Sequence, residues 1–305
     1  MRAPTGTQFS LSLGDSSATI TEVAAGLRGL VLNGVEVVHE YPEHSLPPMG
    51  QGIVLVPWPN RIKNGTWTLD GVEQQLDITE PSTGNATHGL LRNTAYRVAE
   101  RGDSYVTLQA GVYPQHGYPF SLETSVSYEL TDAGLTVTHA ITNESDVPAP
   151  VAVGAHPYFV IGSVPTADLT LTISAETVFE YNKKFIPTGE VSVDGTDFDL
   201  RGGCRVGDVS LNHAFGKLTE TGGQNIHSLS SPDGQRVELW TDSNFGFVQA
   251  YTPREFPLET GTGQAIALEP MTAPANAFNT GQGLRWIEPG DTWMLSWGVR
   301  YRSAS

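Results

Sequence analysis

Two histidines, a glutamate and an arginine combine residue types that can do chemistry with apolar, turn-rich surroundings. His88 is followed by a glycine and His156 by a proline, and each comes shortly after apolar residues. Glu269 ends an apolar run and is followed by a proline, while Asn60-Arg61 follows a run rich in valine and proline. Imidazole and carboxylate groups can transfer protons as general acid and base, and a guanidinium can donate hydrogen bonds to oxygen atoms. These segments are the candidates for a catalytic site.

Each candidate also has a purely structural interpretation. A single histidine after an apolar run is more often a hydrogen-bonded structural residue than a catalytic one. Glu269 could be a strand-end carboxylate exposed to water, because a buried carboxylate is costly without a partner or a task. The occurrence of two such histidines together with Arg61 favours a functional site, but the residues alone leave both interpretations of Glu269 open.

The sequence lacks the motifs of several other reaction types. The chain has no G-x-S-x-G elbow and no P-loop, and Gly261-Thr262-Gly263 lacks the third glycine of a dinucleotide-binding motif. The eight histidines never occur in His-x-His or His-x-x-x-His spacing, and Cys204 is the single cysteine. A disulfide within the chain is therefore excluded, and we expect neither a metal nor a cofactor.

The charge balance argues against nucleic-acid and membrane partners. The 305 residues carry a formal net charge of −16 and contain no basic run, whereas nucleic acids and anionic membranes are bound by clustered lysine and arginine. Residues 1–10 contain no apolar stretch typical of a signal peptide, and no run of about 18 apolar residues predicts a membrane span. We expect no nucleic-acid or membrane partner and a cytoplasmic location.

The elements that must position the candidates are strands. Residues 121–130 and 135–141 alternate between apolar and polar, and the turn 131–134 between them predicts a β-hairpin. No window keeps helical apolar spacing over a dozen residues, and the 33 glycines and 20 prolines provide for many turns. We predict an all-β fold, one large antiparallel β-sandwich, with residues 1–305 as a single domain. Further strand-like runs are Phe9–Leu13, Tyr105–Ala110, Leu169–Ile173, Val237–Trp240 and Phe247–Tyr251.

Seven segments, in order along most of the chain, make it similar to the aldose 1-epimerase (galactose mutarotase) family. Any one of them is weak evidence, but their common order is a strong signal. The segments are Asn60-Arg61-Ile62, His88-Gly89, Gly117-Tyr118-Pro119, His156-Pro157-Tyr158-Phe159, Phe247–Thr252 (the V-Q-x-Y-T strand), Leu268-Glu269-Pro270 with Ala275–Asn279, and Leu284–Gly290.

The resemblance implies a galactose mutarotase-like supersandwich that binds a free hexose such as glucose or galactose and interconverts its α and β anomers. By position, Glu269 would be the general base and His156 the general acid. His88 and Arg61 would bind the sugar and support charge at the ring oxygen. Asn60 and Gln249 would be further hydroxyl contacts.

One position departs from the family pattern. The segment Leu211-Asn212-His213-Ala214-Phe215 resembles one in which an aspartate that binds sugar hydroxyls usually follows the leucine. An amide both donates and accepts hydrogen bonds but carries no charge. We expect Asn212 to contact substrate more weakly, which leaves the hexose preference open; the alternative is that Asn212 is a turn residue.

Two other functions remain open from the sequence. A hexose-6-phosphate 1-epimerase would need additional cations at the phosphate, and the motifs contain few. A noncatalytic carbohydrate-binding sandwich would bind sugar without turnover. In each case the partner is a small-molecule sugar, and the chain is a monomer or a homodimer.

Aromatic residues beside the motifs could stack on a sugar ring. Most aromatic side chains near strands belong to the core, so we expect at most one or two of them to face the ligand. The five candidates are Trp58, Tyr158, Phe159, Phe278 and Trp286.

Overall fold

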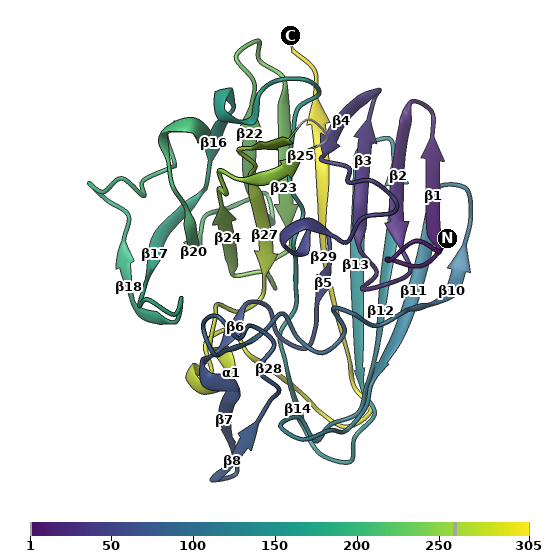
Figure 1. Ribbon diagram of the computed structural model, residues 1–305, viewed down its shortest axis with the longest axis vertical. Helices are drawn as coiled ribbons and strands as arrows, with labels where there is room; N and C mark the ends of the chain where they lie inside the picture. Colours follow the sequence, from purple (N-terminus) through teal and green to yellow (C-terminus); the bar gives the residue numbers. More distant parts are fainter. Residues whose placement is uncertain (1, 259–260, 305) are drawn as a thin grey trace.

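The computed structural model describes residues 2–258 and 261–304, and antiparallel strands dominate it (Figure 1). The largest sheet has ten strands, and β29 pairs with β13 on one side and β23 on the other. From edge to edge it contains β10 (Arg97–Arg101), β11 (Tyr105–Val112), β12 (Leu122–Thr131), β13 (Gly134–Asn143), β29 (Thr292–Arg302), β23 (Arg236–Thr241), β22 (Gln224–Ser230), β16 (Thr170–Thr172) and β19 (Cys204–Arg205), with β21 (Glu220–Thr221) beside β22.

A seven-stranded sheet and a four-stranded sheet lie in front of the largest one in this view (Figure 1). The seven-stranded sheet contains β18 (Pro187–Ser192), β17 (Ala175–Tyr181), β20 (Asn212–Leu218), β24 (Phe247–Tyr251), β27 (Ala267–Met271), β15 (Gly154–Ala155) and β5 (Val54–Leu55), in that order. The four-stranded sheet contains β1 (Gln8–Leu13), β2 (Ser16–Thr21), β3 (Leu27–Leu32) and β4 (Val35–Val38) and contacts β11 and β12.

Short strand pairs and single helical turns connect the sheets. The pairs are β6 (Arg61–Ile62) with β9 (Ala86–Thr87), β7 (Thr66–Leu69) with β8 (Val72–Gln75), β14 (Ala149–Val151) with β28 (Arg285–Ile287), and β25 (Phe256–Leu258) with β26 (Gly261–Gly263). The 3-10 turns are η1 (Pro48–Gly50), η2 (Lys63–Gly65), η3 (Thr166–Asp168) and η4 (Val206–Asp208).

The predicted all-β antiparallel fold is confirmed, including its hairpin. β12 and β13 pair from Leu122↔Asn143 to Thr131↔Gly134, and their apolar residues face the core alternately. One short helix was not predicted: α1 (Ala277–Thr280) is a single turn. It is bounded by Asn276 and Gly281, both in the left-handed region, and is too short for a periodic signal.

Apolar side chains from all three large sheets form one cluster. Leu30 of the four-stranded sheet, Val126 of the ten-stranded sheet and Val248 of the seven-stranded sheet all belong to it, and each is almost fully buried. Burial of apolar area is the main favourable term in folding. The cluster therefore holds the seven-stranded sheet, whose strands carry Asn212, Gln249 and Glu269, against the rest of the molecule. Within the described ranges, no helix is both long and apolar enough to span a membrane.

Candidate active site

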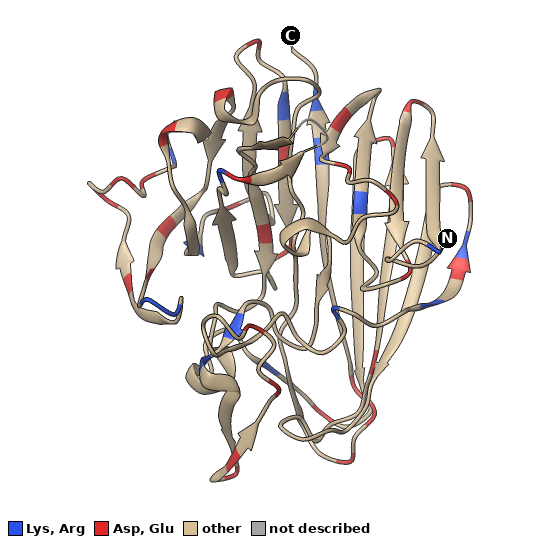
Figure 2. Ribbon diagram, viewed as in Figure 1, with Lys and Arg blue, Asp and Glu red and all other residues tan. Residues whose placement is uncertain are grey.

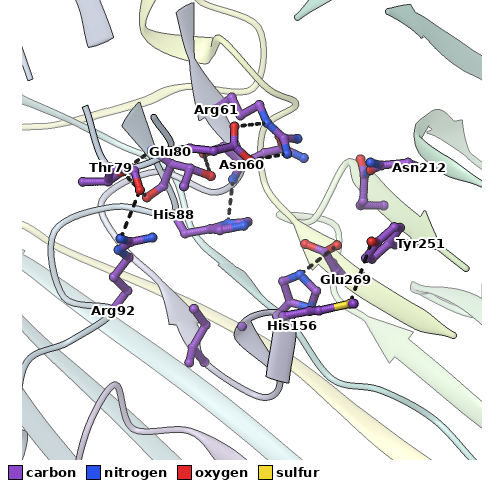
Figure 3. Close-up of a pocket in the computed structure, with 15 residues that line it drawn as sticks. Asn60, Arg61, Thr79, Glu80, His88, Arg92, His156, Asn212, Tyr251 and Glu269 are labelled. Carbon is purple, nitrogen blue, oxygen red and sulfur yellow. Dashed lines mark hydrogen bonds and ion pairs between the residues drawn. The ribbon is translucent and has the colours of Figure 1, made fainter. Parts of the chain in front are cut away.

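One cavity of about 320 Å³ brings the predicted site residues together (Figure 3). Its volume falls in the range of small-molecule sites. All seven residues singled out from the sequence line it, although they are up to 209 positions apart in the chain. They are Asn60, Arg61, His88, His156, Asn212, Gln249 and Glu269.

Three neighbouring strands form one wall of the cavity. In β24, Gln249 lies opposite Glu269 of β27, and Tyr251 lies opposite Asn212 of β20. Side chains two apart in a strand point to the same face, so Gln249 and Tyr251 share the cavity side with their cross-strand partners. The antiparallel register thus converts four separate sequence positions into one polar surface.

Glu269 and His156 meet in this cavity. The Nε2 atom of His156 lies 3.4 Å from Oε1 of Glu269, and the two residues are 4% and 3% exposed. Glu269 lies in the middle of β27, with all five residues of the strand buried, so the alternative of a water-exposed strand-end carboxylate is wrong. Nδ1 of His156 and Oε2 of Glu269 are buried without hydrogen-bond partners. A buried polar atom without a partner is costly, and beside a cavity a ligand can supply the missing hydrogen bond.

Burial sets the charge states of this pair. It raises the pKa of Glu269 to about 8, against a smaller lowering by the charge of Arg61. Burial also lowers the pKa of His156 to about 4. The charge of Arg61 alone would favour the carboxylate form of Glu269, but desolvation of both groups is the larger effect and favours their neutral forms.

His156 is held by backbone contacts and by a stacked ring. Its carbonyl accepts a hydrogen bond from the Gly52 N–H at 2.8 Å, and its own N–H donates to the Ile53 carbonyl at 3.2 Å. The ring of Tyr158 stacks on the imidazole, with centroids 5.3 Å apart and 16° between the planes. These contacts fix the direction in which Nε2 points toward Glu269.

The segments of Asn60 and His88 lock together through the backbone. The His88 N–H donates to the Asn60 carbonyl at 2.9 Å, and the Asn60 N–H donates to Nδ1 of His88 at 3.3 Å. Because Nδ1 accepts this bond, a neutral His88 carries its proton on Nε2 and can donate it to a ligand. Burial, followed by the charges of His156 and Arg61, lowers the pKa of His88 well below its usual value. His88 is therefore a neutral hydrogen-bond donor at the cavity.

Arg61 is paired before any ligand arrives. Its Nε and Nη2 atoms lie 2.7 and 2.8 Å from the two carboxylate oxygens of Glu80, and its Nη1 donates to Oδ1 of Asn60 at 3.2 Å (Figure 3). Burial disfavours the charged form of Glu80, but hydrogen bonds from Arg61 and Thr83 outweigh it and lower the pKa of Glu80. The bidentate pair largely neutralises the guanidinium.

Asn212 takes its orientation from Gln249. The Nε2 atom of Gln249 donates to Oδ1 of Asn212 at 2.8 Å. With its oxygen occupied in this way, Asn212 has its NH₂ group left to donate, whereas an aspartate could only accept. Oε1 of Gln249 is buried without a partner. The alternative of Asn212 as a turn residue is wrong, since it is the first residue of β20.

Sequence reasoning missed five polar lining residues, namely Thr79, Glu80, Thr87, Arg92 and Tyr251. Glu80 is followed by a proline, the same signal that drew attention to Glu269. However, Glu288 also precedes a proline and is exposed, so the signal is not specific. Tyr251 could have been found from its spacing of two after Gln249. Arg92 lies just beyond the second histidine segment, and nothing in the sequence marked it.

None of the five predicted aromatic residues lines the cavity. Trp58, Tyr158, Phe159 and Phe278 are buried, and Trp286 is exposed away from the cavity lining. We expected at most one or two of these residues to face a ligand, and none of them does. The aromatic residue in the cavity wall is Tyr251. Residues 2–258 and 261–304 contain no group of three or more His, Cys, Asp or Glu side chains arranged to hold a metal ion.

Comparison with known proteins agrees with this fold and these motifs. The profile of the aldose 1-epimerase family matches residues 7–299. The chain belongs to the aldose 1-epimerase family. The uncharacterized protein YihR of Escherichia coli K12 is a relative that is 34% identical over 301 residues, covering 96% of this chain and 93% of YihR. Galactose mutarotase from Pongo abelii is 33% identical over 199 residues, which cover 60% of this chain and 56% of that protein.

Solved structures of aldose 1-epimerase homologues have the same architecture. The GalM/aldose epimerase homologue from C. elegans aligns with a TM-score of 0.86 at 20% identity, covering 98% of this chain and 99% of the homologue. The galactose 1-epimerase from Lactobacillus acidophilus NCFM aligns with a TM-score of 0.77 at 20% identity, covering 97% and 95%. At such identities the likeness concerns the fold. The predicted galactose mutarotase-like supersandwich is confirmed.

Proposed function

We propose that the chain is an aldose 1-epimerase, an isomerase that interconverts the α and β anomers of a free hexose such as glucose or galactose. The observation that carries the proposal is the buried pair of His156 and Glu269, with Nε2 and Oε1 3.4 Å apart in a cavity of about 320 Å³ lined mainly by polar side chains. A protein that only binds sugar has no need of a matched acid and base.

The chemistry consists of two coupled proton transfers. To open a pyranose, Glu269 as a carboxylate takes the proton of the C1 hydroxyl, and His156 as an imidazolium delivers a proton to the ring oxygen. The open-chain aldehyde then rotates about the C1–C2 bond and closes on its other face, with both transfers reversed. A positioned acid or base typically contributes about 10²- to 10⁴-fold to the rate.

The charge states of the pair fit the intermediate of this reaction. Ring opening leaves Glu269 protonated and His156 neutral, which is the state that burial favours. A site that stabilises what forms during the reaction more than the starting sugar accelerates the reaction. Between about pH 4 and pH 8 the pair holds one proton that either group can carry, and activity is expected within this window.

The remaining residues would hold the sugar. His88 and Arg61 present N–H donors at the cavity and would support charge at the ring oxygen. Asn60, Gln249 and Asn212 would contact hydroxyl groups, with Gln249 providing an unused acceptor and Asn212 an unused donor.

A second candidate is an aldose that carries an anionic group, such as a hexose 6-phosphate. Arg92 lines the cavity, and its Nη2 contacts the Thr79 carbonyl at 3.4 Å, with no carboxylate salt bridge among the described residues (Figure 3). Since Glu80 neutralises Arg61 and Asn212 replaces an acidic residue, Arg92 gives the cavity a local positive charge. That charge favours an anionic substituent in spite of the net charge of −16.

A polarimetric assay on freshly dissolved α-glucose and α-galactose tests the proposal. Wild-type protein should accelerate the drift of optical rotation, whereas Glu269→Gln and His156→Asn should each lose nearly all of the acceleration. Glu288→Gln, at an exposed glutamate that also precedes a proline, is the control and should keep the wild-type rate. Full activity in both site variants would refute the assigned roles, and sugar binding without acceleration would favour the noncatalytic sandwich.

Glucose 6-phosphate in the same assay separates the two substrate classes. A preference of about tenfold or more for the phosphorylated sugar, lost in Arg92→Gln, would replace the first candidate by the second. Cytoplasmic location, a monomeric or homodimeric state and the absence of metal, cofactor, nucleic-acid and membrane partners remain predictions.

A further inference from the structure

The segment of residues 79–87 does more than line the cavity, because it supplies the partner of Arg61. Glu80 contacts the guanidinium through both carboxylate oxygens, at 2.7 and 2.8 Å. These two hydrogen bonds use the Nε–H and one Nη2–H of Arg61. A third N–H, on Nη1, donates to Oδ1 of Asn60. A guanidinium has five N–H groups, so two are left. The two remaining N–H groups are on the terminal nitrogens, Nη1 and Nη2, of Arg61. Arg61 is itself one of the residues that line the cavity.

Glu80 is itself held on several sides. Its backbone N–H donates to the Asn85 carbonyl at 3.0 Å, and its carbonyl accepts from the Gly84 N–H at 2.9 Å, which closes the turn of residues 80–85. The Thr83 hydroxyl donates a short hydrogen bond to Oε2 of Glu80. A carboxylate fixed by its own turn can fix the group that it binds.

A second element covers the guanidinium. The ring of Phe185, from the connection between β17 and β18, lies with its centroid 4.9 Å from Cζ of Arg61. That connection is tied to the turn of Glu80, because Nδ2 of Asn85 donates to the Lys184 carbonyl at 3.0 Å. Arg61 is thus held in its plane by Glu80 and on one face by Phe185.

We infer that Glu80 is a positioning residue for the proposed epimerase reaction. It orients the free N–H groups of Arg61 toward the sugar and cancels most of the guanidinium charge near Glu269. The inference rests on the proposed function. Without Glu80, Arg61 loses the two hydrogen bonds that fix the plane of its guanidinium and keeps only its contacts with Asn60 and Phe185. Its full charge then favours the carboxylate form of Glu269.

The test compares Glu80→Gln with Glu123→Gln, which removes a carboxylate that is paired with the exposed Arg97 and does not line the cavity. Glu80→Gln should raise the KM for the sugar about tenfold or more, with a smaller change in kcat. It should also move the alkaline limb of the pH–rate profile to lower pH, which a merely structural role would not do. Glu123→Gln should change neither. An unchanged KM and pH profile in Glu80→Gln would overturn the inference.

A milder pair of variants covers the case in which Glu80→Gln fails to fold. Thr83→Val removes the hydroxyl that holds Glu80, and Thr83→Ser keeps it. We expect Thr83→Val to raise the KM by a smaller factor and Thr83→Ser to keep the wild-type value. Equal KM values in the two variants would contradict the role of Glu80.

A spectroscopic readout separates this inference from the proposed function. The Nε–H signal of Arg61 in a ¹H–¹⁵N spectrum, assigned by its loss in Arg61→Lys, should be visible in wild type and lost or strongly shifted in Glu80→Gln. Wild-type protein that shows this dependence but does not accelerate mutarotation would refute the proposed function and leave the positioning of Arg61 intact. An unchanged signal would overturn the positioning itself.

Discussion

At the scale of single residues, the cavity depends on polar atoms that the protein does not satisfy. Oε2 of Glu269, Nδ1 of His156 and Oε1 of Gln249 are buried without partners. Each such atom lowers the free energy of unfolding, because it has lost its hydrogen bonds to water. The residues concerned are those proposed to contact a sugar. Stability and function therefore oppose each other at these positions.

The pKa of Glu269 predicts a pH-dependent gain in stability when the carboxyl is removed. In the unfolded chain a glutamate ionises near 4.5, whereas in the folded protein Glu269 ionises near 8. Between these values the folded state binds more protons, so the stability contribution of Glu269 is complete below pH 4.5 and is lost as pH rises toward 8. Glu269→Gln should therefore raise the Tm, and the gain should grow from pH 5 to pH 8.

Thermal unfolding at pH 5, 6.5 and 8 measures this gain. Glu288→Gln, at an exposed carboxyl, should show no such trend. A gain that is equal at all three pH values would mean that Glu269 is already ionised in the folded protein at neutral pH.

At the scale of elements, the site depends on close contact between the loop that carries His88 and the segment that follows β5. His88 lies in the left-handed region with φ 60°, and Gly89 follows with φ 74°. A Cβ at Gly89 would lie 2.0 Å from the Val56 carbonyl oxygen, just before the segment of Asn60 and Arg61. The close approach of these two backbones places His88 beside Asn60.

Gly89→Ala should therefore destabilise the protein by at least about 3 kcal/mol, because strain from the positive φ adds to a clash with backbone. The matched control is Gly71→Ala, where φ is 80° but no atom lies within 4 Å of the added Cβ. The control should lose only about 1–2 kcal/mol. Denaturant unfolding of both variants measures the difference, and similar losses would mean that the clash is relieved by backbone movement.

At the scale of the whole molecule, acidic residues are spread over loops and strands, and lysine and arginine are fewer (Figure 2). The net charge of −16 therefore describes the surface as a whole but not the cavity, where Arg61, Arg92, Glu80 and Glu269 lie within one site. The global charge only argues against a nucleic-acid partner, which stays a prediction, whereas substrate class depends on the local arrangement. The single-domain organisation of residues 1–305 remains a prediction.

Buried histidines outside the site make the whole fold sensitive to acid. Burial lowers the pKa of His227 to about 4 and that of His139 to about 3. As pH falls below 6.5, the unfolded chain binds protons at these positions before the folded protein does, so stability decreases. His227→Asn, which retains an acceptor for the Ser174 N–H, should reduce the loss of Tm between pH 6.5 and pH 4. The same change at the exposed His44 should not, and equal acid sensitivity of wild type and His227→Asn would contradict the burial effect.

Much of the fold and of the site could be predicted from local patterns. The alternation around residues 131–134 specifies a hairpin because side chains in a strand point alternately to the two faces, and strand bounds such as 247–251 match. The ordered segments around Asn60, His88, His156 and Glu269 were sufficient to indicate the family. Turn composition indicated an all-β fold without any coordinates, and net charge argued against a nucleic-acid partner.

Tertiary structure decided what those residues can do. The 3.4 Å contact between His156 and Glu269 joins positions 113 residues apart, and burial of both groups, which outweighs the charge of Arg61, favours their neutral forms. Glu80 and Arg92 have no distinctive local sequence context, so only chain packing identifies them as neighbours of the site. Sequence periodicity reports which face of a strand a residue occupies, whereas desolvation and pairing depend on what the rest of the chain places against that face.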